Sequence, residues 1–234
     1  MADRTRARQL AAAALQRGDP TGWFEELYSE AEAGTSVVPW ADRFPNPLLV
    51  EFLDRAKISG SALVVGCGYG DDAEELARRG FRVTAFDVAA SAVAKCRERF
   101  PRSAVNYEVA DVLHPPESWT GAFDLVVEIS TLHLLPPAPR AAAQANIARF
   151  PASGGILLVI ARGREHDEPE GQMPWPLTRG EMVRFESLGL SEVSFEDILD
   201  GDDPPVRRFR AAYAAIKPAD APTQSMPLLK STPI

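Results

Sequence analysis

From residue 61 onward, short apolar runs alternate with stretches that have the composition of helices, and this alternation limits the possible folds more than any other feature. The apolar runs span 62–66, 82–87, 104–111, 123–130 and 154–161, and the helical stretches span 71–80, 90–100 and 138–150. The run 154–161 has no polar interruption, as expected for a strand that is buried on both faces. The pattern predicts an α/β fold in which helices cover a parallel, doubly wound sheet.

The N-terminal part of the chain reads as helical. We expect helices over 4–17, 19–34 and 47–57, and the second has Asp19 as a possible cap followed by Pro20 at the first helical position. Its aromatic residues fall on or near one face, so this helix should cover an apolar surface. We therefore expect residues 1–57 to form a helical cover.

The last third of the chain has a different pattern. Thr178 and Glu181 stand at the spacing of a capping box and open a predicted helix over 178–189. The segments 191–199 and 206–216 alternate apolar and polar residues, which is typical of two neighbouring strands near a sheet edge. Together they complete a sheet domain over 58–217. A Pro-rich tail without periodicity, 218–234, should be disordered.

Composition excludes several classes of protein. The chain has 25 Lys and Arg against 33 Asp and Glu, a net charge of −8, which argues against a nucleic-acid partner. No apolar run approaches the roughly 20 residues of a membrane helix, so we expect a cytoplasmic protein with no membrane partner. Cys67 and Cys96 have no His or Cys at ligand spacing, so we expect two small buried residues and no metal site. The oligomeric state is not predicted.

The first apolar run breaks into three glycines and then two acids, GCGYGDD at 66–72. In a doubly wound sheet the ligand lies at the carboxyl ends of the strands. A dinucleotide site would carry a small residue where Asp71 stands, and Asp72 follows it, so two carboxylates would repel a phosphate. A ligand with its own positive charge would explain both features. The loop residues expected against it are Gly66, Cys67, Gly68 and Gly70.

Acidic residues also end the next two apolar runs. Asp87 could accept hydrogen bonds from both hydroxyls of a ribose, and the carboxylate or a neighbouring amide of Asp111 could read an adenine edge. The expected ligand then has adenine, ribose and a cationic end but no phosphate, which matches S-adenosylmethionine. Two alternatives of other classes stay open: a dinucleotide-dependent oxidoreductase and a cofactor-binding protein without catalysis.

With these residues the sequence, over roughly 61–216, resembles the class I S-adenosylmethionine-dependent methyltransferases. VVGCGYG, AFD, VAD and GAFDLVVE match the successive motifs of that family in order and spacing. The resemblance implies a Rossmann-like sheet of seven strands with the last strand antiparallel, and an S-adenosylmethionine-binding methyltransferase domain over 58–217. A narrower resemblance, to thiopurine and thiol/halide methyltransferases, is carried by 66–93 and 123–140 with PW upstream and MPWPLT downstream.

The narrower resemblance implies roles for individual residues. The loop glycines would cradle the methionine part of the cofactor, Asp72 would face its amino group, Asp87 would hold the ribose, and Asp111 with Val112 would hold the adenine. The cofactor contacts expected are Trp40, Gly66, Cys67, Gly68, Gly70, Asp72, Asp87, Val88, Asp111, Val112 and Glu128. The substrate contacts expected are Trp23, Phe24, Tyr28, His133, Arg162 and Trp175.

Methyl transfer from a sulfonium is an in-line displacement, so the protein mainly has to align donor and acceptor in a dry pocket. Glu128 and His133 are the candidate catalytic bases, although Glu128 could instead contact the cofactor or the cover, and His133 could be structural. Arg162 could meet an acidic substrate and Trp175 could stack on a flat one, or both could be ordinary loop residues. Because the sequence offers few candidate bases, an acceptor that ionises easily is favoured. We therefore expect S-methylation of a small-molecule thiol, with O- or N-methylation as the alternative. Ile129 stands where thiol/halide enzymes often have an aromatic residue, which argues against a halide or a small thiol.

Overall fold

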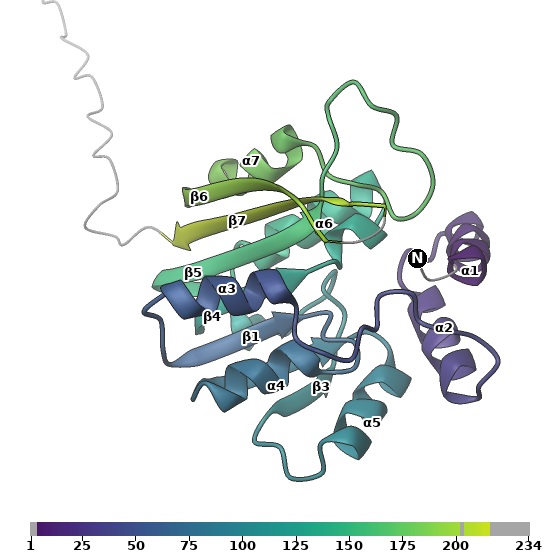
Figure 1. Ribbon diagram of the computed structural model, residues 1–234, viewed down its shortest axis with the longest axis horizontal. Coiled ribbons are helices and arrows are strands. Elements are labelled where there is room, and N and C mark those ends of the chain that lie inside the picture. Colours follow the sequence, from purple (N-terminus) through teal and green to yellow (C-terminus); the bar gives the residue numbers. More distant parts are fainter. Residues whose placement is uncertain (1–3, 202–203, 216–234) are drawn as a thin grey trace, which may run out of the picture.

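A seven-stranded sheet forms the centre of the protein (Figure 1). The computed structural model describes residues 4–201 and 204–215. The strands lie in the order β3-β2-β1-β4-β5-β7-β6, and β7 alone runs antiparallel to its neighbours. The predicted α/β fold with an antiparallel last strand is confirmed. The strands are β1 (Ser61–Val65), β2 (Arg82–Asp87), β3 (Asn106–Val109), β4 (Phe123–Ile129), β5 (Pro151–Arg162), β6 (Leu190–Leu199) and β7 (Arg207–Ala215).

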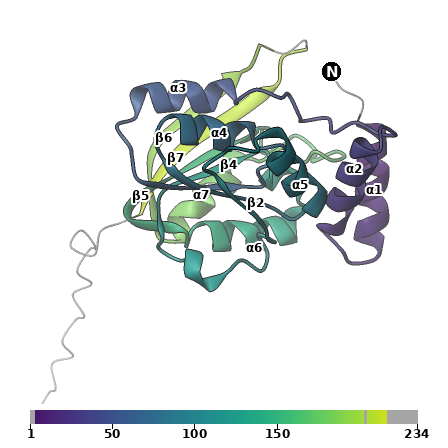
Figure 2. The same cartoon turned by 90° about the horizontal axis from the view of Figure 1, so that it is seen from below.

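Helices cover both faces of the sheet, as its apolar strands require (Figure 2). One face carries α3 (Pro47–Arg55), α4 (Asp71–Arg78) and α5 (Ala90–Arg99), and the other carries α6 (Pro137–Ile147) and α7 (Arg179–Ser187). Successive residues of β5 divide between the two faces, because side chains alternate along a strand. Leu157 and Val159 belong to the core beneath α6 and α7, whereas Leu158 and Ile160 belong to the core beneath α3 and α4.

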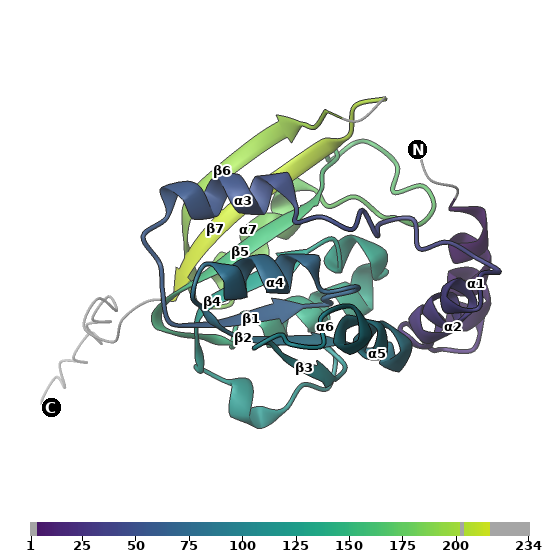
Figure 3. The same cartoon turned by 60° about the horizontal axis from the view of Figure 1, so that its bottom comes forward.

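The two N-terminal helices, α1 (Thr5–Gln16) and α2 (Gly22–Glu32), lie together at one end of the sheet, beyond the carboxyl ends of the parallel strands (Figure 3). Polar contacts attach α2 to the rest of the domain. The Glu25 carboxylate accepts the Ser91 backbone N–H (3.0 Å) at the start of α5, and Glu32 pairs with Lys95 (2.8 Å). These helices therefore form a lid over the end of the sheet where a ligand is expected.

Two details of the N-terminal part differ from the expected helices. The second helix begins at Gly22 and leaves Pro20 outside it, because one Asp19 carboxylate oxygen accepts the N–H groups of Thr21 (3.1 Å) and Gly22 (2.7 Å) and turns the chain first. The third predicted helix, now α3, packs on a sheet face and buries Leu49 there. The domain boundaries at 57 and 217 stay predictions.

The C-terminal helix begins as the sequence predicts. The Thr178 hydroxyl accepts the Glu181 N–H (3.2 Å), and the Glu181 carboxylate accepts the Thr178 N–H (2.8 Å), which is the predicted capping box. None of the helices in the described part of the chain is both long and apolar enough to span a bilayer. The tail predicted over 218–234 lies outside the described residues, and the cytoplasmic location stays a prediction.

Candidate active site

A pocket of about 530 Å³ lies between the carboxyl ends of β1 to β4 and the N-terminal part of the chain at α2 and Trp40. This is the position that doubly wound sheets use for ligands. The pocket combines carboxylates from strand ends with an aromatic wall from the N-terminal part. It is lined by Thr21, Phe24, Tyr28, Trp40, Gly66, Phe86, Asp87, Val88, Ala110, Asp111, Val112, Ile129, Ser130, Thr131, Leu134 and Leu135.

The glycine loop brings the backbone close to this pocket. Gly66 has φ +61°, a backbone conformation that residues with a side chain rarely adopt. A Cβ built on it would lie 2.1 Å from the Thr131 hydroxyl oxygen. Only a glycine allows this approach between the end of β1 and the segment after β4. Cys67, Gly68 and Gly70 do not line the pocket wall itself, and their expected cofactor contacts stay predictions.

The two acids after the glycines have different partners. Asp71 pairs in a bidentate manner with Arg99 of α5, with both N–O distances 2.8 Å, so its charge is balanced within the protein. Asp72 accepts only the backbone N–H of Asn46 (2.7 Å) among the hydrogen bonds of the described residues, and burial raises the pKa of its carboxyl to about 6. The expectation that both acids repel a phosphate therefore needs correction: Arg99 balances the charge of Asp71, whereas Asp72 has a backbone N–H and no guanidinium as its hydrogen-bond partner.

The strand-end acids reach the pocket together. Asp87 is buried; one of its oxygens accepts the Gly68 N–H (2.9 Å) and the other accepts the Ala89 N–H (2.9 Å). Burial raises the pKa of the Asp87 carboxyl to about 6. Asp111, two residues beyond the end of β3, accepts the Leu113 N–H (2.8 Å). Each carboxylate oxygen keeps a further lone pair, so both acids can still accept hydrogen bonds from a ligand.

The aromatic wall comes from α2 and the segment after it. Phe24 and Tyr28 lie one helical turn apart on α2, and Trp40 packs edge-on against both, at centroid distances of 6.2 and 6.5 Å. The Trp40 indole N–H donates to the Tyr28 hydroxyl oxygen (3.0 Å). Trp23 is not part of this wall: it stacks on Phe24 (3.9 Å) in the core and is 1% exposed.

Glu128 lies at the end of β4 and is completely buried. One carboxylate oxygen accepts the N–H groups of Thr131 (2.7 Å) and Leu132 (2.9 Å), and the other oxygen has no hydrogen-bond partner within the described part of the chain. Burial raises the pKa of the Glu128 carboxyl to about 7. Its contacts are those of a group that holds the segment 130–135 in place, and this segment contributes four of the pocket-lining residues.

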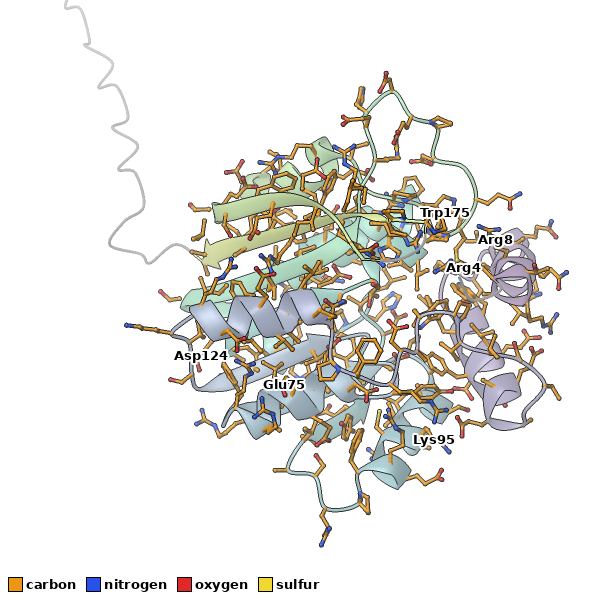
Figure 4. The ribbon with its side chains drawn as sticks, viewed as in Figure 1. Arg4, Arg8, Glu75, Lys95, Asp124 and Trp175 are labelled. Carbon is orange, nitrogen blue, oxygen red and sulfur yellow. The ribbon has the colours of Figure 1, made fainter. Side chains whose placement is uncertain are left out.

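His133, Arg162 and Trp175 meet beside the pocket and do not line it. The His133 ring Nδ1 accepts the Arg162 backbone N–H (3.1 Å), and the His133 carbonyl accepts the Trp175 N–H (2.7 Å). Burial, with the positive charge of Arg162, lowers the pKa of the His133 ring well below its usual value, so the ring is neutral. The Arg8 guanidinium donates to the Met173 carbonyl (2.7 Å), which joins α1 to the segment that carries Trp175 (Figure 4).

Sequence reasoning missed one residue that organises this region, Arg140 of α6. Its guanidinium is 1% exposed and donates to the carbonyls of Leu132, Leu135 and Trp175, and it also pairs with Glu181. Arg140 thereby ties the pocket segment to the loop after β5 and to α7. An arginine in an Ala-rich helix gives no sequence signal for this role, because two of its partners, Trp175 and Glu181, are 35 and 41 residues away in the sequence.

The two cysteines, which are distant in the sequence, lie next to the same backbone group. The Cys96 thiol is 3.1 Å and the Cys67 thiol 3.9 Å from the Gly68 carbonyl oxygen. The Cys96 thiol, together with burial, raises the pKa of the Cys67 thiol well above its usual value. Both are free cysteines. Nowhere in residues 4–201 and 204–215 do three or more His, Cys, Asp or Glu side chains form a group that could hold a metal ion.

Comparison with known proteins finds similarity mainly in the central part of the chain. A family model described as a methyltransferase domain matches residues 62–155. A 2-heptyl-1-hydroxyquinolin-4(1H)-one methyltransferase of Mycobacteroides abscessus is 25% identical over 62% of this chain, and thiocyanate methyltransferase 1 of Arabidopsis thaliana is 28% identical over 59%. The chain spans 64% and 60% of the length of these two relatives. A ubiquinone biosynthesis O-methyltransferase of Pseudomonas paraeruginosa is 36% identical over 39% of this chain, and the match covers 41% of that relative.

Solved structures share the fold. The N-methyltransferase NodS of Bradyrhizobium japonicum, in complex with S-adenosylhomocysteine, matches 82% of this chain and 98% of its own, with a TM-score of 0.63 and 21% identity. A 1,6-didemethyltoxoflavin-N1-methyltransferase of Burkholderia thailandensis, with S-adenosylhomocysteine bound, matches 93% of this chain and 94% of its own, with a TM-score of 0.67 and 15% identity. At these identities the similarity supports the fold alone.

Proposed function

We propose that this protein, which carries a class I S-adenosylmethionine-dependent methyltransferase domain, transfers the methyl group of S-adenosylmethionine to a small-molecule acceptor. The observation that carries the proposal is the convergence of Gly66, Asp87 and Asp111 on one pocket beneath the aromatic wall of α2. A nicotinamide dinucleotide is a poorer ligand for this pocket, because Asp72 follows the loop where the dinucleotide would bring its phosphates.

The residues of the pocket fit this cofactor. In the proposed arrangement Asp87 accepts hydrogen bonds from the ribose hydroxyls, Val88 and Val112 pack against the adenosine, and Asp111 lies at the adenine edge. In the same arrangement the methionine part lies along the glycine loop, whose backbone a ligand can approach closely, and Asp72 faces its amino group. When bound, the cofactor supplies an electrophilic sulfonium methyl group. The protein orients the acceptor toward that methyl group and excludes water, which is most of what this displacement needs.

The proposed acceptor is a thiol, with a hydroxyl or amine as the alternative. The wall made by Phe24, Trp40 and Leu134 is apolar and suits the body of an organic molecule. Neither Glu128 nor His133 lines the pocket, and a thiol needs a base less than an alcohol does. The relatives named above include a thiocyanate and an O-methyltransferase. Because the net charge is −8, we propose no nucleic-acid partner.

Calorimetric titration with S-adenosylhomocysteine, the product form of the cofactor, tests the proposal, with NADH as the competing ligand. We expect binding of the first and none of the second. Asp87→Ala should weaken S-adenosylhomocysteine binding by about tenfold or more, since two hydrogen bonds at about 0.5–1.5 kcal/mol each are lost. Asp124→Ala is the matched control: Asp124 also accepts a backbone N–H, from Ser61 (2.7 Å), but at the opposite ends of the strands. Preference for NADH, or equal effects of the two changes, would contradict the proposal.

The acceptor atom is tested by turnover. The protein with S-adenosylmethionine is incubated with panels of aryl thiols, phenols and amines, and S-adenosylhomocysteine release is measured. Faster turnover of the thiols supports S-methylation, and faster turnover of phenols or amines selects the alternative. Tight cofactor binding with no turnover across all three panels would instead support a cofactor-binding protein without catalysis.

A further inference from the structure

The Tyr28 hydroxyl is a buried polar group that extends over the glycine loop. Tyr28 is 2% exposed and belongs to the pocket wall. Its oxygen accepts the Trp40 indole N–H (3.0 Å), and a Cβ built on Gly68 would lie 2.9 Å from it. The hydroxyl is therefore held in one position, directly above the loop that the methionine part of the cofactor is proposed to occupy.

The proton of this hydroxyl has no acceptor in the described part of the protein. Within residues 4–201 and 204–215, the only hydrogen bond of Tyr28 through its hydroxyl is the one it receives from Trp40. Burial, with the nearby charge of Asp87, raises the pKa of the Tyr28 phenol well above its usual value, so the group stays protonated. A buried donor without an acceptor is unfavourable, which makes a ligand atom the natural acceptor.

The pocket provides this donor but no side chain that is placed to take a proton from an acceptor. Tyr28, Asp87 and Asp111 are the titratable residues among those that line it. Both oxygens of Asp87 accept backbone N–H groups, and Asp111 accepts the Leu113 N–H. In the proposed function both acids face the adenosine. An acceptor that has to lose its proton inside this pocket would find no base beside Tyr28.

We propose that Tyr28 donates its hydrogen bond to the anionic atom of the acceptor, so that the protein methylates acceptors that have already ionised in solution. The acceptor class is an acidic thiol or an acidic hydroxyl on an aromatic ring. A lone pair of the anion forms the new bond to the methyl carbon, the carbon–sulfur bond of the sulfonium breaks, and its electron pair stays on sulfur as a neutral thioether. No proton is transferred. This inference rests on the proposed function.

Probe binding tests the inference without requiring turnover. The protein is saturated with S-adenosylhomocysteine and titrated with 4-nitrothiophenol and, separately, 4-nitrophenol, whose ionised forms have their own absorbance bands. We expect at least one probe to bind as its anion, with a pKa lower than that of the free probe. The two probes distinguish sulfur from oxygen. If neither probe binds as an anion, the inference is overturned.

Tyr28→Phe removes the donor and keeps the ring. We expect anion affinity, and kcat/KM wherever the probe is methylated, to fall roughly 10- to 150-fold, the range for a hydrogen bond to a charged group at about 1.5–3 kcal/mol. Affinity for S-adenosylhomocysteine should change less than about twofold. Tyr213→Phe is the matched control, because it removes a buried tyrosine hydroxyl that bonds to the Met182 carbonyl (2.9 Å) away from the pocket. Trp40→Phe, which removes the N–H that orients Tyr28, should give an intermediate loss.

Each outcome separates the inference from the function on which it rests. If the wild-type protein does not bind S-adenosylhomocysteine, the proposed function fails. If it binds the cofactor product but Tyr28→Phe weakens that binding in parallel with the probe, Tyr28 contacts the cofactor and the inference fails alone. A pH profile of kcat/KM adds a further test with aryl thiols of graded acidity. Its inflection should follow the pKa of each thiol, and one common inflection for all thiols would reveal a protein base.

Discussion

Replacing Arg140 with methionine should destabilise the protein more than any surface substitution, because it removes the donor that serves three buried carbonyls. The guanidinium donates to Leu132 O (3.1 Å), Leu135 O (3.1 and 3.0 Å) and Trp175 O (3.1 Å). Methionine keeps the aliphatic volume but offers no donor. The Glu181 carboxylate also loses its partner, although it is 26% exposed and can be hydrated.

The size of the effect follows from these contacts. A buried carbonyl left without a donor costs about 1–3 kcal/mol. The loss at Leu132 is smaller, since its carbonyl also accepts the Leu135 N–H (3.2 Å). Breaking a buried ion pair costs about 3–5 kcal/mol in general. We therefore expect Arg140→Met to lower the free energy of unfolding by about 4 kcal/mol, out of roughly 5–15 kcal/mol for a typical domain.

Chemical denaturation of the two proteins, followed by circular dichroism, measures this difference. Arg149→Met is the matched control, because Arg149 bonds to Glu117 (3.1 Å) and Thr120 (3.2 Å) at the surface with its side chain 50% exposed. Arg149→Met should lower the free energy of unfolding by less than about 1 kcal/mol. If Arg140→Met lowers the free energy of unfolding no more than Arg149→Met does, then other groups donate to the carbonyls and the role assigned to Arg140 is wrong.

Two further predictions concern the pocket. Burial raises the pKa of Glu128 from 4.5 to about 7, so its carboxyl stabilises the fold at low pH and this contribution is lost as pH rises through about 7. Between pH 5 and pH 8 the free energy of unfolding of the wild-type protein should fall by about 1–3 kcal/mol more than that of Glu128→Gln, as measured by chemical denaturation. An equal change in the two proteins would contradict this. Gly66→Ala should abolish S-adenosylhomocysteine binding, because its Cβ would meet Thr131 at 2.1 Å. Gly80 also has a positive φ (+93°), but no atom lies near the position of its Cβ, so the Gly80→Ala protein should bind S-adenosylhomocysteine normally in calorimetry. If both variants lose binding, backbone strain is the cause instead.

The sequence was sufficient to predict the sheet and the strand-end acids. Strands buried on both faces are continuous apolar runs in the sequence. Asp87 ends β2 and Asp111 lies two residues beyond β3, at the edge where a parallel sheet gathers its ligand groups. The methyltransferase domain match over 62–155 agrees with that interpretation. Local rules also predicted the capping box at Thr178, because it involves residues three positions apart.

What the sequence could not reveal depends on side chains that meet only in the folded protein. Arg99 balances Asp71 from the next helix on the same face, and no local pattern links the two. The aromatic residues of α2 fall on or near one face of the helix, yet Tyr28 lines the pocket whereas Trp23 is buried in the core. The contact that attaches α2 to α5, between Glu25 and Ser91, likewise joins residues 66 positions apart in the sequence. The roles predicted for Glu128 and His133 as bases stay predictions, and neither residue lines the pocket.

The position of β7 has a consequence for how the chain is made. β6 precedes β7 in the sequence, but β7 lies between β5 and β6 in the sheet and is the sole strand with which β6 pairs in the described part of the chain. During synthesis, which proceeds from the N-terminus, β6 therefore has no place to bind until residues 207–215 have emerged. Until then the open edge of β5 is exposed to pairing with other chains. Loss of this one late segment would remove two strands from the sheet, while every residue that lines the pocket would already have been made.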